Sequence, residues 1–184
     1  TGFIFAYNTA QAYIQSNMCR TVLLIGSERL SRLVDWTDRG TCILFGDGAG
    51  AAVLKAAEGR AYLPVSHSDG KKGEALTCDR YIHMDGRAVF QFAVTRVPEV
   101  IREVLTKNEL LMDDVDYFVL HQANRRIVEA VAKRLRQPIE KFPMNLQEYG
   151  NTSSASIPIL LDEMNRSGKL KKGQKLVVAG FGAG

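Results

Sequence analysis

A short apolar run that leads directly into a histidine constrains the fold of this chain more than any other feature. Residues 117–120 (Tyr-Phe-Val-Leu) show no alternation with polar residues, which is typical of a strand buried on both faces. His121 follows at once, and residues 124–136 then predict a helix, because their apolar side chains recur at helical spacing. Those side chains are Ile127, Val128, Val131, Ala132 and Leu135. The stretch therefore predicts a buried strand, a histidine and a helix in direct succession.

The place of His121 after a strand suggests a role in chemistry. In open α/β sheets, ligands bind in the crevice beyond the carboxyl ends of the strands. A histidine there, beside the backbone N–H groups that open a helix, is suited to acting on a carbonyl oxygen. A hydrogen-bonded core histidine is the more common outcome of position alone, so the local pattern leaves both interpretations open.

The rest of the chain predicts alternating helices and strands, and hence an α/β fold. The predicted helices cover residues 1–18, residues 88–107 and a segment from Ser153 or Ser154 to Gly168. Pro98 is expected to kink the second of these helices or to mark its first turn. The predicted strands cover residues 21–26, 63–67 and 175–179. Two further apolar runs, 41–45 and 49–54, predict a hairpin, because Gly46-Asp47-Gly48 between them has the chemistry of a tight turn.

Composition excludes several classes of protein. The chain has 184 residues, of which 46% are hydrophobic and 24% charged, as in ordinary soluble globular domains. No apolar run approaches the roughly 18 residues of a membrane span. Cys19, Cys42 and Cys78 contain no C-x-x-C pair, which argues against a metal site or a disulfide framework and fits a reducing cytoplasm. The net charge of +4 comes without a nucleic-acid recognition motif, so we expect an acidic partner or a phosphate-bearing ligand instead.

Three ordered motifs resemble the signatures of the β-ketoacyl-ACP synthase III family, whose members start bacterial type II fatty-acid synthesis. They are His121-Gln122-Ala123-Asn124-x-Arg126, the run from Tyr149 to Ser156, and Phe181-Gly182-Ala183-Gly184. The resemblance extends from Thr1 to Gly184. It implies the thiolase fold, a five-layered α-β-α-β-α arrangement of two similar halves. Residues 1–57 would end the first half and residues 58–184 would form most of the second, so that the chain is expected to be truncated at both ends.

The resemblance also implies catalytic groups. The family's nucleophilic cysteine lies at the N-terminus of the first helix, directly before the position of Thr1, and none of the three cysteines here matches it. His121 and Asn151 would donate hydrogen bonds to the malonyl thioester oxygen during decarboxylation. We expect a neutral imidazole, because the N-terminal end of a helix disfavours its cation. The backbone N–H of Ala183, where the family often has glycine, would complete a second oxyanion hole.

The substrate and the carrier protein are implied in the same way. Arg39 would stack on the adenine of coenzyme A, while Gly86 and Phe90 would line its pantetheine tunnel together with Asn124 and Phe181. The segment of Gln122, Ala123, Asn124, Arg125 and Arg126 would contact acyl carrier protein, with a solvated helix face as the alternative for its arginines. The coenzyme A thioester is then a substrate, and no further cofactor or metal is expected. Homodimers are a family expectation.

Three functions remain open from the sequence. The first is the synthase, which would use acetyl-CoA or a branched acyl-CoA. The second is a related acyltransferase that starts polyketides or other secondary metabolites, which acyl-donor preference would separate from the first. The third is a non-catalytic remnant that binds coenzyme A or a partner, although the retention of His121 and Asn151 argues against it. We expect the isolated chain to be inactive and poorly stable, because truncation leaves sheet edges unpaired.

Overall fold

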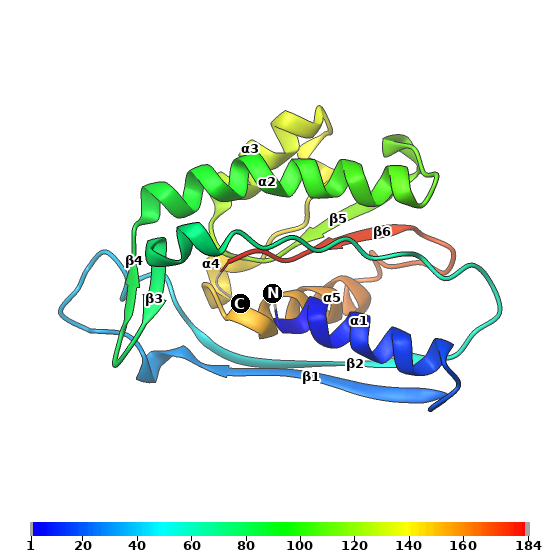
Figure 1. The fold of residues 1–184 in the computed structure, drawn as a ribbon, viewed down its shortest axis with the longest axis horizontal. Coiled ribbons are helices and arrows are strands. Elements are labelled where there is room, and N and C mark those ends of the chain that lie inside the picture. The colour runs from blue at the N-terminus through cyan, green and yellow to red at the C-terminus, as the bar shows by residue number, and fades with distance from the viewer. Residues whose placement is uncertain (1, 183–184) are drawn as a thin grey trace.

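The computed structural model describes residues 2–182, which form a mixed α/β fold (Figure 1). In chain order the helices are α1 (Gly2–Gln15), α2 (Gly86–Lys107), α3 (Arg125–Leu135), α4 (Leu146–Tyr149) and α5 (Ser156–Arg166). The strands are β1 (Thr21–Arg29), β2 (Asp47–Lys55), β3 (Leu76–Cys78), β4 (Ile82–Met84), β5 (Tyr117–Leu120) and β6 (Leu176–Ala179). Among these residues, no helix combines the length and the apolar character that a membrane span requires.

The main elements are stacked in four layers. From top to bottom, Figure 1 shows α2 with α3, then β5 with β6, then α5 with α1, and last β1 with β2. The β5–β6 pair is parallel, and the β1–β2 pair is antiparallel. The layers alternate between helix and sheet, so each interior sheet face is covered by helices.

The strand β5 lies between two hydrophobic cores, as its sequence predicts. Phe118 and Leu120 point into the core formed with α2 and α3. Val119 points the other way, into a core shared with α1, β1 and α5. All three side chains have no exposed surface. Since successive side chains of a strand face opposite sides of a sheet, burial on both faces explains the unbroken apolar run.

The outer face of the β1–β2 sheet is apolar and uncovered. Leu23 and Val53 are cross-strand neighbours on this face, with 61% and 68% of their surfaces exposed, and Ile25 beside them is 62% exposed. A fifth layer of helices on this face would complete the α-β-α-β-α order that the resemblance implies. The predicted division of the chain at residues 57 and 58 stays a prediction.

The predicted hairpin of residues 41–54 is wrong. β2 pairs instead with β1, in a register that runs from Thr21 opposite Lys55 to Arg29 opposite Asp47. Residues 41–44 form turns, and Phe45 makes an isolated parallel bridge with Asn151. Gly46 is required for close approach rather than for a turn, because a Cβ atom there would lie 2.1 Å from the carbonyl oxygen of Tyr149.

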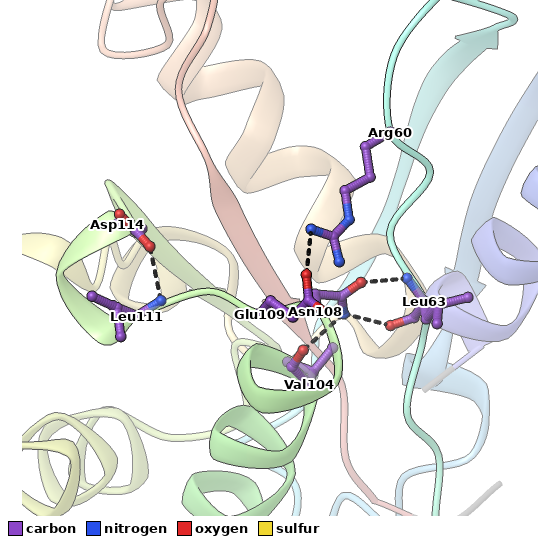
Figure 2. A network of polar contacts seen from close by, with 7 residues as sticks. All are labelled: Arg60, Leu63, Val104, Asn108, Glu109, Leu111 and Asp114. Carbon is purple, nitrogen blue, oxygen red and sulfur yellow. Dashed lines mark hydrogen bonds and ion pairs between the residues drawn. The ribbon is translucent and has the colours of Figure 1, made fainter.

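The predicted strand at residues 63–67 is also absent. This segment is extended, and the side chain of Asn108 takes the place of a neighbouring strand (Figure 2). The Asn108 Oδ1 atom accepts from the N–H of Leu63 at 2.7 Å, and Nδ2 donates to the Leu63 carbonyl at 2.9 Å and to the Val104 carbonyl at 2.7 Å. One buried amide therefore satisfies both backbone groups of Leu63, which no pattern of apolar residues could reveal.

The predicted helices shift at their ends because of local caps. α2 begins at Gly86, since the Asp85 carboxylate accepts from the backbone N–H groups of Arg87 and Ala88, both at 3.0 Å. Pro98 is buried inside α2 and does not mark its first turn. The last predicted helix starts as a 3₁₀ turn at Ser153–Ala155 that continues into α5.

Candidate functional site

His121 is the residue that directly follows β5, and its surroundings are almost entirely protein. Its backbone N–H donates to the Ala179 carbonyl at 2.8 Å, which extends the pairing of β5 with β6 by one step. The ring has its Nδ1 atom 2.7 Å from the Ser156 hydroxyl, and Phe181 packs against it edge-on at 5.3 Å between ring centroids. The residue is 7% exposed. These contacts hold the imidazole in one orientation at the end of the sheet.

Burial sets the charge of His121. It lowers the pKa of the imidazole from 6.5 to about 3, because a cation inside the protein loses its hydration. The direction of this shift agrees with the expected neutral state, and its main cause is burial rather than the helix dipole. A neutral imidazole offers one N–H donor and one acceptor nitrogen, so His121 can donate a hydrogen bond without carrying charge.

Asn151 is fixed through both its backbone and its side chain. Its N–H donates to the Leu44 carbonyl at 2.8 Å, and its carbonyl accepts from the N–H of Gly46 at 3.0 Å. Its side-chain Oδ1 accepts from the N–H of Ser153 at 2.9 Å. Because the amide oxygen is engaged in this way, the NH₂ group is the part of the side chain left to donate to a ligand.

A cavity of about 210 Å³ lies beside these residues. It joins Asn151 to the segment that follows His121, and it brings in the turn before β2. The lining residues are Ile43, Leu44, Ala123, Asn124, Arg125, Leu146, Gly150 and Asn151. Residues of two of the three sequence motifs therefore meet at one opening, although His121 itself does not line it.

The residues expected to bind coenzyme A lie on several separate elements. Arg39 lies on an exposed turn, and Gly86 is the exposed first residue of α2. A Cβ atom at Gly86 would meet only Met84, at 3.9 Å, so the fold itself does not require glycine there. Phe90 is half-buried, and the Arg126 guanidinium lies over its ring at 5.8 Å. Ala183, expected as a backbone donor, lies outside the described residues.

The segment from Gln122 to Arg126 divides into a buried and an exposed part. Gln122 has no exposed surface; its amide donates to the Leu120 carbonyl at 2.8 Å and accepts from the N–H of Asn145 at 3.1 Å. The prediction that Gln122 contacts a carrier protein is therefore wrong, because its polar groups are used inside the fold. Asn124 caps α3 by accepting from the N–H of Arg126 at 2.8 Å. Arg125 and Arg126 are exposed.

Sequence reasoning missed the groups that orient the two main residues. Ser156 touches His121 although it lies 35 residues further along the chain. The residues that hold the backbone of Asn151, Leu44 and Gly46, come from the misassigned hairpin. The sequence does carry one signal for Ser156: it is a polar residue in the second motif, on a predicted helix face that is otherwise apolar. Within residues 2–182, no group of three or more His, Cys, Asp or Glu side chains is arranged to hold a metal ion.

Comparison with known proteins matches this geometry to one family. The model of 3-oxoacyl-[acyl-carrier-protein (ACP)] synthase III matches residues 1–70, and the model of its C-terminal part matches residues 105–184. The β-ketoacyl-[acyl-carrier-protein] synthase III of Clostridium novyi is 45% identical over the whole of this chain, and that of Acaryochloris marina is 47% identical. The chain spans 62% and 61% of the lengths of these two proteins.

Solved structures agree with the sequence relatives. The 3-oxoacyl-[acyl-carrier-protein] synthase III of Aquifex aeolicus superposes with a TM-score of 0.94 at 45% identity, over 98% of this chain and 60% of that one. The priming β-ketosynthase of the R1128 polyketide pathway gives a TM-score of 0.92 at 36% identity, over 99% and 59%. From its first helix to its last strand, this chain belongs to the β-ketoacyl-[acyl-carrier-protein] synthase III family.

Proposed function

We propose that this chain supplies the decarboxylating part of a β-ketoacyl-ACP synthase III active site. The complete reaction would transfer an acyl group from acyl-CoA to an enzyme cysteine, with release of coenzyme A. The acyl group would then condense with malonyl-ACP to give β-ketoacyl-ACP and CO₂. The observation that carries this proposal is the buried, neutral His121 beside the end of the sheet.

Decarboxylation of a malonyl thioester needs hydrogen-bond donors, and His121 and Asn151 can provide them. When the bond between the malonyl α-carbon and its carboxylate breaks, CO₂ leaves and the electron pair moves into the thioester carbonyl, whose oxygen becomes negative. Neutral donors already aimed at that oxygen stabilise the charge as it develops. His121 and the NH₂ group of Asn151 are proposed as these donors. Loss of one such donor typically slows a reaction by about a hundred- to a thousandfold.

The second half of the reaction would use the resulting carbanion equivalent. Its carbon attacks the carbonyl of the acyl thioester, a carbon–carbon bond forms, and the cysteine leaves as a thiolate. We propose that this cysteine occupies the position directly before Thr1, where the family carries it. It would then lie at the N-terminus of α1, where the helix dipole stabilises a thiolate.

The exposed basic side chains of α3, together with Arg136 directly after it, are proposed as the docking site for acyl carrier protein. Arg126, Lys133, Arg134 and Arg136 are exposed, whereas Arg125 is paired with Glu129 at 2.7 Å. An acidic partner would be attracted by this helix face. Arg126 is the closest of the four in sequence to His121, so we propose it as the main contact with the carrier protein.

Product analysis with the full-length enzyme tests the proposal; here this means the present sequence extended at both ends to the length of its relatives. Incubation with acetyl-CoA and malonyl-ACP should convert the carrier protein to its acetoacetyl form, seen by intact-mass spectrometry. The variant His121→Ala should still gain an acetyl group but form no product. The control His83→Ala changes an exposed ring and should form product normally. Unchanged condensation by His121→Ala would contradict the proposal.

A polyketide-starting enzyme is the second candidate, supported by the superposition with the R1128 priming β-ketosynthase. A series of acyl-CoA donors would separate the two candidates. Preference for acetyl-CoA or a branched acyl-CoA supports fatty-acid initiation, and preference for a different acyl donor supports the second candidate. A full-length enzyme that neither gains an acyl group nor forms product would instead indicate a non-catalytic remnant.

A further inference from the structure

We infer that Ser156 is a positioning residue that fixes the tautomer of His121, so that Nδ1 is the acceptor and Nε2 carries the proton. Ser156 is the first residue of α5 and is 2% exposed. Its hydroxyl oxygen lies 2.7 Å from Nδ1 of His121. The catalytic consequence of this contact rests on the function proposed above, whereas the tautomer is a property of the folded chain itself.

The direction of the hydrogen bond follows from the partners of the hydroxyl group. The Ser156 oxygen accepts from the backbone N–H of Gln122 at 3.3 Å. Its own hydrogen has one acceptor among the described residues, the Nδ1 atom of His121. If Nδ1 were protonated, it would donate to the serine oxygen, and the hydroxyl hydrogen would then be buried with no acceptor among the described residues, which costs about 1–3 kcal/mol.

The other ring nitrogen is the one available to a substrate. The Nε2 atom of His121 makes no hydrogen bond within residues 2–182. His121 keeps 7% of its surface exposed. With Nδ1 engaged by Ser156, a proton on Nε2 is the one that His121 has left to donate to a ligand. The proposed decarboxylation needs a donor there, not an acceptor.

Neighbouring contacts hold the Ser156 hydroxyl and the His121 imidazole in fixed relative positions. Gln122, whose N–H reaches the hydroxyl, is held at both ends of its amide by Leu120 and Asn145. The backbone of His121 is tied to β6 through Ala179. The Phe181 ring packs edge-on against the imidazole of His121. One hydroxyl group therefore links the start of α5 to the end of β5, so that the fold determines the tautomer of His121.

Nitrogen NMR of the chain tests the tautomer directly. The protein has three histidines, so ¹⁵N-labelled imidazole signals can be assigned by single substitutions. At neutral pH we expect the His121 Nδ1 signal of an unprotonated, hydrogen-bonded nitrogen and the Nε2 signal of a protonated one. A protonated Nδ1 in the unmodified chain would overturn the inference, whatever the activity of the enzyme.

Variants of Ser156 then test its role in the full-length enzyme. Ser156→Ala should slow CO₂ release from malonyl-ACP by about 10- to 100-fold, which is the range typical of groups that orient metal-binding histidines. It should lower kcat more than it raises KM, leave acetyl transfer intact and shift the Nδ1 signal. Ser156→Thr keeps the hydroxyl and should restore the tautomer signal and most of the rate.

A serine at the other end of the same helix provides the control. The Ser167 hydroxyl, just after α5, donates to the Met164 carbonyl at 3.2 Å, and Ser167→Ala should change neither the His121 signals nor CO₂ release. An unaltered rate and signal in Ser156→Ala would contradict the positioning role. If instead the full-length enzyme released no CO₂ at all while the tautomer matched, the proposed function would fail and the structural inference would stand.

Discussion

At the scale of single residues, surroundings decide what each histidine can do. His67 and His83 are exposed and face carboxylates, with Nε2 of His67 2.6 Å from Glu103 and Nε2 of His83 3.3 Å from Asp79. His121 is buried and contacts the neutral hydroxyl of Ser156. Burial disfavours the cation of a histidine, and His121 is the one buried histidine of the three. His121 therefore has the environment of a neutral hydrogen-bond donor.

The depressed pKa of His121 predicts a loss of stability in acid. The folded state holds the imidazole neutral down to about pH 3, whereas in the unfolded chain it takes up a proton near pH 6.5. Below about pH 6.5 the unfolded state binds more protons, so this residue removes up to about 1.4 kcal/mol of unfolding free energy per pH unit. Urea unfolding between pH 7 and pH 5 measures this slope.

Two variants isolate the contribution of His121 to that slope. His121→Asn has no group that titrates in this range, so its stability should fall less steeply between pH 7 and pH 5. His67→Gln alters an exposed ring and should keep the steep dependence. A slope in His121→Asn as steep as that of the unmodified chain would show that other groups cause it.

At the scale of elements, the sequence predicted those whose periodicity reflects local burial. The helix expected at residues 124–136 is α3, and the strand expected at residues 117–120 is β5. The first strand, expected at residues 21–26, continues to Arg29 because its whole length pairs with β2. Hydrophobic patterning therefore predicted the strand and the helix on either side of His121, which is why this histidine could be singled out from the sequence.

The elements that were mispredicted depend on distant partners. The Gly46-Asp47-Gly48 run has the composition of a hairpin turn, but the carboxylate of Asp47 binds the backbone and hydroxyl of Ser31 at 2.8 and 2.6 Å. Gly46 lies against Tyr149, more than one hundred positions away. Such contacts leave no periodic signal, so neither the position of Asn151 nor the contact between Ser156 and His121 could be derived from the sequence.

The side chain of Asn108 is predicted to fasten residues 57–69 to the end of α2. Asn108→Ala removes three hydrogen bonds from a residue that is 2% exposed and leaves both backbone groups of Leu63 without a partner. We expect a loss of about 1–3 kcal/mol in the free energy of unfolding. Denaturant titration measures the loss, and hydrogen exchange at Leu63 should accelerate.

A neighbouring ion pair in the same network is the control for Asn108 (Figure 2). Arg60 lies 3.5 Å from Glu109, and both side chains are at least half exposed. Arg60→Ala should change stability by no more than about 1 kcal/mol, as is usual for exposed ion pairs. Equal losses in Arg60→Ala and Asn108→Ala would contradict the special role of the buried amide.

At the scale of the whole molecule, the uncovered face of β1 and β2 sets the behaviour of the isolated chain. Leu23, Ile25 and Val53 form an apolar surface of the kind that normally contacts protein. The chain spans 62% of the length of its Clostridium novyi relative. We therefore predict that the 184-residue chain self-associates at micromolar concentrations, which sedimentation velocity can measure.

Substitutions on the exposed face should relieve that association without harming the fold. Ile25→Thr combined with Val53→Thr changes two side chains that are more than 60% exposed, and threonine is well accepted in strands. The double variant should sediment more nearly as a monomer of 20.4 kDa with similar unfolding. Exposed Leu111 lies elsewhere on the surface, and Leu111→Thr should leave the association unchanged. An effect of equal size in both variants would rule out a specific role for this face.

The rate of CO₂ release from malonyl-ACP by full-length Asn151→Asp tests the central claim most directly. The substitution keeps the shape of the side chain but replaces the NH₂ donor with an oxygen. If His121 and Asn151 together stabilise the developing negative charge, release should fall by about a hundredfold or more, while transfer of the acetyl group to the enzyme continues. CO₂ release at the unmodified rate would contradict the account.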